Sequence, residues 1–318
     1  MPLVKRSTYR SRPFYMINGH LETVIPSMFF KIEGVTYRRE RLELSDGDFL
    51  DLDWSEVGSK RLLVITHGLE GSSDRYYVKR SVKYFNERGW DVLAWNCRSC
   101  SGEMNRLPRL YHHGDTADLD TVINQSLEKD YDELWLLGYS MGGSMSFKYL
   151  GELKVDDRIR GAIGFSVPCN LRDSGEQLRI KRNRIYEKKF LDRLKIKMHQ
   201  KAKMGIDIDV NGLDEMEEFD EFHHKYTVPL HGFSSLDDFY EKATCDQYLT
   251  KIDRPILIAN ALNDPILGEK CYPVDLAQAN EHIHLDLPNV GGHCGFSYFQ
   301  KWYSWMEVRT EQFIKSQT

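Results

Sequence analysis

The 318-residue sequence contains no long run of apolar residues. No segment reaches the roughly 18 consecutive apolar residues of a membrane-spanning helix. Residues 1–15 also lack the apolar stretch of about 7–15 residues that a secretory signal requires. The 6 cysteines are too sparse for a secreted domain held together by disulfides. We therefore expect a cytoplasmic protein with reduced thiols.

The chain also has no excess of positive charge. Its 43 Lys and Arg residues are outnumbered by 48 Asp and Glu residues, which gives a formal net charge of −5. Without a basic field or a nucleic-acid-binding motif, the sequence indicates small-molecule partners and no nucleic acid. A hydrophobic content of 41% supports one large domain with an insertion. No feature points to a particular oligomeric state.

Metal-binding and redox motifs are scarce as well. Cys97 and Cys100 have C-x-x-C spacing, but no second cysteine pair completes a zinc site and no other thioredoxin signal accompanies them. His67 has no partner at ligand spacing. The favoured interpretation is that the two cysteines are ordinary thiols, with a redox or metal role as the alternative. We expect no metal and no organic cofactor.

Short apolar segments alternate with helical patterns along most of the chain. Residues 35–44 and 49–54 flank a turn and predict a hairpin. Further strands are predicted at 61–66, 91–95, 133–137, 159–167, 255–261 and 282–287, and helices at 74–88, 116–128, 143 onward and 297–314. Continuous apolar strands separated by helices indicate an α/β fold with a mostly parallel sheet covered on both faces. Such sheets bind ligands beyond the carboxyl ends of their strands.

This alternation stops between residues 168 and 251. The segment 179–203 is rich in Lys and Arg, whereas 207–221 is rich in Asp and Glu. We therefore expect a core made of residues 1–167 and 252–318, with residues 168–251 inserted as a helical cap. The aromatic side chains of this insertion suggest an apolar acyl site; they include Tyr186, Phe190, Phe222, Phe233 and Tyr240.

One segment of the expected cap has an apolar stripe. Tyr186, Phe190, Leu194 and Met198 recur every four residues, which places them on one helix face. The favoured interpretation packs this stripe on the core and pairs the basic face with the acidic segment. The alternative is a basic amphipathic helix that makes peripheral contact with an anionic membrane or a lipid substrate.

The most informative motif is the G-x-S-x-G pattern at residues 138–142. It follows the apolar strand 133–137 and precedes a helical pattern, which is the context of a nucleophile elbow. Small residues on either side of the serine allow strand and helix to approach closely. We therefore predict Ser140 as a catalytic nucleophile. The alternative is a tight turn whose serine caps the next helix.

A nucleophilic serine requires a base and a group that orients the base. Asp264 follows the strand 255–261, and His293 follows the strand 282–287 in a glycine-containing loop. The chain order Ser, Asp, His is that of α/β-hydrolases. Asp286 and Asp253 do not lie at carboxyl edges of strands. We predict Asp264 as the acid and His293 as the base.

Acyl attack on a carbonyl also requires preorganised hydrogen-bond donors for the oxyanion. We expect one backbone N–H from Met141, which begins the helix after the elbow. We expect the other from Leu69, because the glycines of residues 67–71 let the backbone turn its N–H groups inward.

Several further segments carry a resemblance to a known family. They are residues 18–23 with Pro26, 67–72, 96–109, 111–116 and 291–296. Together with the predicted triad, they make the chain similar to the YheT-type branch of the α/β-hydrolases, which includes esterases and phospholipases. The resemblance implies Ser140 as nucleophile, Asp264 as acid and His293 as base. Membrane-anchored relatives have an amino-terminal span, so the resemblance favours a soluble bacterial-type member.

Three positions depart from the family pattern. Cys97 stands where an aromatic residue is expected, Ser99 where glycine is expected, and Cys294 where a small aliphatic residue is common. The first two affect the loop after the strand 91–95 rather than the triad.

These features predict a serine hydrolase that cleaves carboxylic esters, with a lipid or medium-chain acyl ester as the substrate type. One alternative passes the same acyl-enzyme to another acceptor, as an acyltransferase does, or forms it from a thioester. A second alternative is a hydrolase-fold protein that binds ligands without turnover. Serine at the elbow excludes a hydrolase with an Asp nucleophile.

Overall fold

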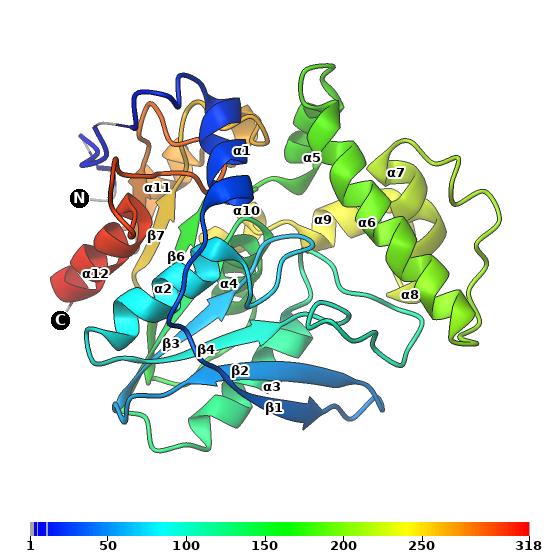
Figure 1. Cartoon of the computed structure of the whole chain (residues 1–318), viewed down its shortest axis with the longest axis horizontal. Coiled ribbons are helices and arrows are strands. Elements are labelled where there is room, and N and C mark those ends of the chain that lie inside the picture. Colours follow the sequence, from blue (N-terminus) through cyan, green and yellow to red (C-terminus); the bar gives the residue numbers. More distant parts are fainter. Residues whose placement is uncertain (1–2, 5, 11, 318) are drawn as a thin grey trace.

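The computed structural model describes residues 3–4, 6–10 and 12–317 (Figure 1). Within these residues, eight strands form one sheet in the order β1-β2-β4-β3-β5-β6-β7-β8. β1 pairs with β2 and β2 pairs with β4 antiparallel, whereas the later pairings are parallel. The strands are β1 (Arg38–Glu43), β2 (Phe49–Ser55), β3 (Arg61–Thr66), β4 (Asp91–Asn96), β5 (Glu133–Tyr139), β6 (Ile159–Phe165), β7 (Ile256–Ala259) and β8 (Ile283–Asp286).

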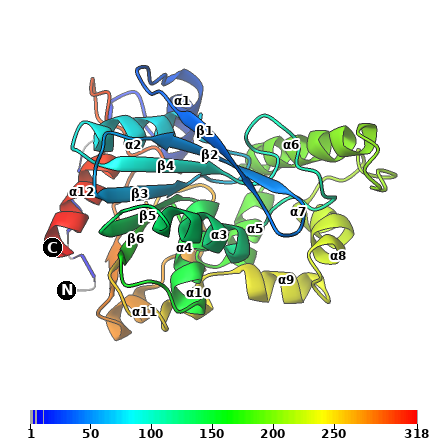
Figure 2. The same cartoon turned by 90° about the horizontal axis from the view of Figure 1, so that it is seen from below.

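Helices flank this sheet on both faces. They are α1 (Gly19–Phe29), α2 (Tyr76–Asn86), α3 (Thr116–Leu127), α4 (Met141–Glu152), α10 (Asp246–Leu249), α11 (Val274–Ala279) and α12 (Trp305–Gln317), with the short η2 (Glu269–Cys271). Figure 2 shows α2 and α12 on one side of the sheet and α3 and α4 on the other. The predicted α/β-hydrolase architecture is therefore confirmed.

Side chains of a central strand alternate between the two faces because a strand has a period of two residues. In β3, Leu62 and Val64 join the buried cluster that α3 and α4 cover. Leu63 and Ile65 join the cluster beneath α2 and α12. This two-sided burial explains why the parallel strands are continuous apolar runs.

Between β6 and β7 the described residues form helices and loops. They include α5 (Leu171–Arg179), α6 (Arg184–Lys203), α7 (Phe219–Phe222), the π-helical turn η1 (His223–Thr227), α8 (Val228–Leu230) and α9 (Leu236–Ala243). Figure 2 shows α5 to α9 gathered beyond one end of the sheet. We refer to residues 168–251 as the cap.

Among the elements that differ from the prediction are α1 and α12. No helix is predicted over residues 19–29, yet α1 forms there, with the Asn18 side chain accepting the Leu21 N–H. The last helix begins at Trp305, not near residue 297. Ser304 and Glu307 explain this later start, because Glu307 accepts the Ser304 N–H and the Ser304 hydroxyl accepts the Met306 N–H. This reciprocal pairing resembles a capping box.

Candidate active site

Ser140 lies on a sharp turn between β5 and α4. Its φ of 53° and ψ of −119° put a non-glycine residue in a strained backbone region. A Cβ added to Gly138 would lie 2.3 Å from the Gly142 carbonyl oxygen, and one added to Gly142 would lie 2.2 Å from the Thr66 oxygen. Both glycines are therefore required for the close approach of strand and helix that the G-x-S-x-G motif predicts.

The structure brings Asp264 and His293 together. The Asp264 oxygens lie 2.9 and 3.1 Å from His293 Nδ1, and the Asp264 side chain is fully buried. Asp264 also accepts the Ile266 N–H at 2.9 Å, which fixes the carboxylate. Asp286 instead lies in β8 and pairs with Arg309 at 2.9 Å. Asp264, and not Asp286, therefore lies beside His293.

The loop that carries His293 rests on α1. Thr23 accepts the His293 N–H through its hydroxyl at 2.9 Å, and Glu22 accepts the Gly291 N–H at 3.0 Å. The Asn263 side chain bridges the same loop, because it accepts the Gly292 N–H and donates to Glu22. Sequence reasoning identified residues 18–23 only as a family signature. Their contacts give that signature a physical role in holding the His293 loop.

The two predicted oxyanion donors flank Ser140. Met141 is the first residue of α4, and Leu69 follows Gly68, where an added Cβ would lie 3.3 Å from the Ser140 Cβ. Within the described part of the chain, no acceptor takes the backbone N–H of Leu69 or of Met141. Both N–H groups are therefore free for a ligand oxygen.

His67 supports the loop of Leu69 from below. Its Nδ1–H donates to the Gly68 carbonyl at 2.7 Å, and its Nε2 accepts the Cys97 N–H at 3.1 Å. Burial lowers the pKa of His67 to about 4, so the ring is neutral near pH 7. Both ring nitrogens of this residue are thus used to hold the loop in place.

Glu70 joins the same loop to the cap. Its side chain accepts the Tyr111 hydroxyl and the Lys197 ammonium, each at 2.7 Å, and its own N–H donates to the Tyr111 oxygen. Glu70 has a φ of 54°, so its backbone is held in the left-handed region by these partners. Sequence reasoning included Tyr111 only in a family signature and did not find Lys197, since residues distant in sequence give no local signal of this contact.

One cavity is lined by Ser140, His293 and Leu69 together. The cap covers it with apolar side chains, which include Leu178, Phe190, Leu194, Met198, Phe222 and Tyr240. Of the five aromatic residues proposed for an acyl site, Phe190, Phe222 and Tyr240 line the cavity. Tyr186 instead hydrogen-bonds to His20 at 2.9 Å, and Phe233 packs against His112 with ring centres 5.2 Å apart.

Known proteins are similar to this chain in sequence and in fold. The family model Hydrolase_4, described as serine aminopeptidase S33, matches residues 58–270. YheT of Escherichia coli (strain K12) is 32% identical over 88% of this chain and 84% of that protein. That protein is named as an esterase. The chain belongs to the α/β-hydrolase family.

Other α/β-hydrolases show the same relationship. Bovine phospholipase ABHD3 is 27% identical over 89% of this chain and 72% of that protein. The structure of the Pyrococcus furiosus esterase Pf2001 has a TM-score of 0.59 at 15% identity, covering 90% of this chain and 96% of that one. The protein is therefore a serine hydrolase of the esterase and lipase type.

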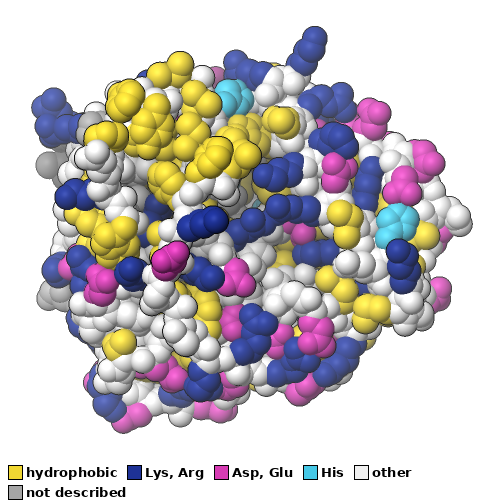
Figure 3. All heavy atoms as spheres, viewed as in Figure 1, with side chains coloured by type: hydrophobic (Ala, Val, Ile, Leu, Met, Phe, Trp, Pro, Cys, Tyr) yellow, Lys and Arg dark blue, Asp and Glu magenta, His cyan; other side chains and the backbone are white. Residues whose placement is uncertain are grey.

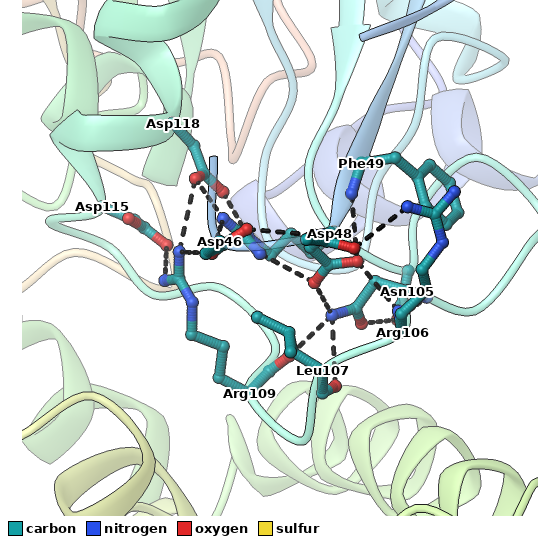
Figure 4. Close-up of polar contacts among 12 residues, drawn as sticks. Asp46, Asp48, Phe49, Asn105, Arg106, Leu107, Arg109, Asp115 and Asp118 are labelled. Atoms are coloured by element: carbon teal, nitrogen blue, oxygen red, sulfur yellow. Dashed lines mark hydrogen bonds and ion pairs between the residues drawn. The ribbon is translucent and has the colours of Figure 1, made fainter. Parts of the chain in front are cut away.

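A buried polar network holds the long loop between β4 and α3 of this α/β-hydrolase (Figure 4). Asp48 accepts the Arg98 guanidinium at 2.7 Å, the Asn105 amide at 2.5 Å and the Arg106 N–H at 2.8 Å. Arg98 also pairs with Asp118 of α3 at 2.7 Å. The family signature at residues 96–109 thus ties the β1–β2 hairpin and α3 to the loop that leads to the cavity.

The departure from the family pattern at Ser99 has a structural explanation. Ser99 has a φ of 61°, in the region that favours glycine. Its hydroxyl lies 2.5 Å from the Asn105 side-chain oxygen and accepts the Asn105 N–H at 3.1 Å. These two contacts hold a serine in the conformation for which the family pattern has glycine.

Apolar residues of the long cap helix α6 pack inside the protein. Leu194 and Met198 are buried and line the cavity. Cations around α6 pair with the acidic segment, as Arg184 does with Glu218 and Arg179 does with Asp220. Both observations favour the packing interpretation of the stripe. Among residues 3–4, 6–10 and 12–317, no helix is long and apolar enough to cross a bilayer.

Proposed function

We propose that this hydrolase cleaves carboxylic esters through a Ser140–His293–Asp264 triad. The observation that carries the proposal is the pairing of Asp264 with His293 beside a cavity that Ser140 also lines. The strained turn at Ser140 supports it, because such turns expose a nucleophile at the sheet edge. Esterase and phospholipase names among the relatives support an ester or lipid ester as the substrate class.

In this mechanism, the Ser140 oxygen attacks the acyl carbon while His293 takes the hydroxyl proton. The backbone N–H groups of Leu69 and Met141 stabilise the oxyanion, and each such donor contributes about 3–4 kcal/mol to transition-state stabilisation. His293 then donates its proton to the leaving alcohol, and Asp264 stabilises the imidazolium. Water attacks the acyl-enzyme in a second cycle and releases the acid.

A fluorophosphonate probe tests the nucleophile. Wild-type protein should become labelled, and Ser140→Ala should not. The same variant should hydrolyse p-nitrophenyl esters several orders of magnitude more slowly, because triad members act as a unit. Ser144→Ala is the matched control, since Ser144 is a buried serine in α4, the helix that follows Ser140, and its hydroxyl has no hydrogen-bond partner among the described residues. Labelling that persists in Ser140→Ala would refute the assignment.

The same acyl-enzyme is also the intermediate of two other reactions. An acyltransferase passes the acyl group to an alcohol, and a thioesterase forms the acyl-enzyme from a thioester. Product analysis with added alcohol acceptors and with acyl thioesters separates these reactions from ester hydrolysis. A protein that binds esters without labelling or turnover would instead be a ligand-binding member of the family.

Peripheral contact with an anionic membrane is the second proposal, and exposed apolar residues near the cap favour it. Figure 3 shows apolar side chains gathered over α1 and bordered by Lys and Arg. Phe14, Met28 and Phe29 are exposed by 78%, 63% and 67%. Lys189 and Arg193 of α6 have no carboxylate partner among the described residues. Apolar and cationic side chains on one face fit the interface of an anionic bilayer.

Vesicle co-sedimentation tests this contact. Wild-type protein should bind phosphatidylglycerol vesicles more than phosphatidylcholine vesicles, and added salt should weaken the binding. A Met28→Ser/Phe29→Ser variant should lose binding, whereas Val57→Ser, which removes an exposed apolar residue from the β2–β3 connection, should retain it. No binding to either vesicle by wild-type protein removes the proposal.

We also propose a cytoplasmic location, as expected from the sequence. All 6 cysteines lie within the described residues, and all are buried free thiols. A reducing compartment maintains such thiols.

A further inference from the structure

Four histidines other than His293 line the cavity. His112 and His113 come from the core loop before α3, whereas His223 lies in η1 and His231 follows α8 in the cap. Core and cap thus each contribute two imidazoles to a cavity whose cap wall is otherwise mostly apolar. None of the four belongs to the proposed triad.

The rings of His112, His223 and His231 pack together through Phe239, and His113 lines the same cavity beside His112. The His112 and His231 rings meet edge to face with centres 4.6 Å apart. The His223 ring lies 4.6 Å from Phe239, and His112 lies 6.1 Å from the same buried ring. The side chain of Phe239 therefore joins the core and cap histidines into a single packed group.

Not all ring nitrogens of this cluster have partners. His112 accepts the Gly114 N–H through Nδ1 at 3.1 Å, and His223 Nδ1 lies 2.9 Å from the Thr227 hydroxyl. The rings of His113 and His231 make no hydrogen bond within the part of the chain that the structure describes. Polar groups in an apolar cavity are costly unless they are paired, so these nitrogens favour a polar ligand group.

The local backbone also marks this part of the cavity. Residues 223–227 form a π-helical turn, which brings His223, Tyr226 and Thr227 to the cavity wall. Short π-helical segments are rare and occur frequently at functional sites. The turn therefore places hydrogen-bonding groups where a continuous α-helix would present a different set of side chains.

These imidazoles are neutral near pH 7. Burial lowers the pKa of His223 to about 4 and that of His113 to about 3. Burial also lowers the pKa of His231 to about 2 and that of His112 well below its ordinary value. A neutral imidazole offers one N–H donor and one acceptor nitrogen, which suits a ligand oxygen.

A metal ion fits this cluster less well. One ligand atom each of His112, Asp115 and His231 lie within 4.8 Å of one another. However, the Arg109 guanidinium already donates to the Asp115 carboxylate at 3.2 Å, and the Gly114 N–H already occupies Nδ1 of His112. The Arg109 cation opposes metal binding, and the hydrogen bond to His112 Nδ1 leaves the proton of the neutral ring on Nε2, where it blocks a ligand bond.

We propose that the His112–His113–His223–His231 cluster binds an oxygen-bearing end of the substrate's acyl chain, a hydroxyl or a carboxylate. The apolar wall formed by Leu178, Phe190 and Leu194 holds the methylene chain between this end and the ester. The inference rests on the proposed ester hydrolysis and names its substrate class. The favoured substrates are esters of chain-terminally oxygenated acids rather than of simple alkanoic acids.

The test compares p-nitrophenyl esters of equal chain length that end in methyl, hydroxyl or carboxylate, over several lengths. At one length, kcat/KM for the hydroxyl or carboxylate ester should exceed that for the methyl ester by about tenfold or more, because a polar subsite rejects an analogue that leaves its groups unpaired. The better of the two oxygenated ends identifies the natural group.

Variants link this preference to the cluster. The measured quantity is kcat/KM for the oxygenated ester divided by kcat/KM for the methyl ester. His113→Leu and His231→Leu should each reduce this ratio toward one. His224→Gln is the matched control, because His224 is an exposed histidine in the same π-helical turn, and it should keep the wild-type ratio. A wild-type ratio near one at every length, or a ratio that neither variant changes, would overturn the proposal.

Binding without turnover separates this inference from the proposed reaction. Calorimetry on Ser140→Ala should show tighter binding of a linear dicarboxylate or ω-hydroxy acid than of the monocarboxylate of equal length, even if no ester is hydrolysed. Absence of turnover with every ester counts against the triad, whereas equal binding of these acids counts against the cluster. A preference that disappears after EDTA treatment would assign the role to a metal instead.

Discussion

The Asp264 carboxylate pairs with the imidazole of His293. Its side chain is fully buried, and both oxygens lie near His293 Nδ1. The second hydrogen bond, from the Ile266 N–H, keeps the carboxylate from turning away. In the proposed reaction this geometry holds His293 in the tautomer whose Nε2 is free to accept the serine proton.

Asp264→Asn should therefore lower kcat by about 10³–10⁴-fold while the fold stays intact, because an amide does not hold the required tautomer. Steady-state kinetics on a p-nitrophenyl ester, with circular dichroism as a check on folding, measures this effect. The control is Asp253→Asn, which removes a carboxylate paired with Arg254 outside the cavity. A folded Asp264→Asn protein with near wild-type turnover would disprove the acid's role.

At the scale of elements, the packing of α4 against α10 depends on a glycine. A Cβ on Gly151 would lie 2.2 Å from the backbone oxygen of Tyr248 in α10. Gly175 in α5 is also helical, but a Cβ there would meet only the Tyr240 hydroxyl at 3.5 Å, an ordinary contact.

Gly151→Ala should consequently reduce the free energy of unfolding by about 1–3 kcal/mol, because α10 must move away from α4. Gly175→Ala should leave that free energy unchanged or raise it by up to about 1 kcal/mol, since alanine favours a helix over glycine. Chemical denaturation of both variants distinguishes them. Equal effects would show that the α4–α10 contact adjusts without cost.

Two ion pairs hold α12, one to α2 and the other to the turn that follows α2, and they differ in burial. Arg80 and Glu307 are 1% and 0% exposed and lie 3.1 Å apart. Arg88 and Glu311 also lie 3.1 Å apart, but they are 34% and 23% exposed. The comparison tests burial, because both pairs link α12 to neighbouring residues of the same segment at the same distance.

Arg80→Leu should destabilise the protein by about 3–5 kcal/mol, since it leaves the Glu307 carboxylate buried without its cation. Arg88→Leu should cost about 0–1 kcal/mol, because water solvates Glu311. Thermal unfolding of the two variants gives the comparison. Similar shifts in Tm would contradict the importance of burial here.

At the scale of the whole molecule, buried neutral histidines link stability to pH. His67 has an ordinary pKa of 6.5 and a folded-state pKa of about 4, because of its burial. Below pH 6.5 the unfolded chain binds a proton at this residue that the folded protein does not bind. Stability is therefore complete above pH 6.5 and falls as the pH drops toward 4. The four cavity histidines act in the same direction.

We expect the free energy of unfolding to decrease between pH 6.5 and 4, with His67 alone contributing up to about 1.4 kcal/mol per pH unit. Urea denaturation across this range measures the slope. His67→Gln should lower stability at neutral pH but reduce the slope, whereas the exposed His224→Gln should leave the slope unchanged. An unaltered slope in His67→Gln would mean that other groups control the acid response.

Local patterns predicted much of this architecture. The apolar run before Ser140 and the glycines at 138 and 142 are contiguous, so strand, turn and helix follow from neighbouring residues. The order of Ser140, Asp264 and His293 at strand ends likewise follows from reading the chain in one direction. The start of α12 was misplaced because residues 297–304 form a loop that a bridge between Ser297 and Ser304 closes.

The amino-acid sequence by itself determined the parallel sheet, the elbow and the residues of the proposed triad, because short-range periodicity and spacing encode them. Only the tertiary structure placed α1 beneath the His293 loop, through a contact between Thr23 and His293. It also joined Glu70 to Lys197 and brought the histidines of loop and cap into one cavity. Such contacts join residues far apart in the chain, and they form only when the packed core positions both partners.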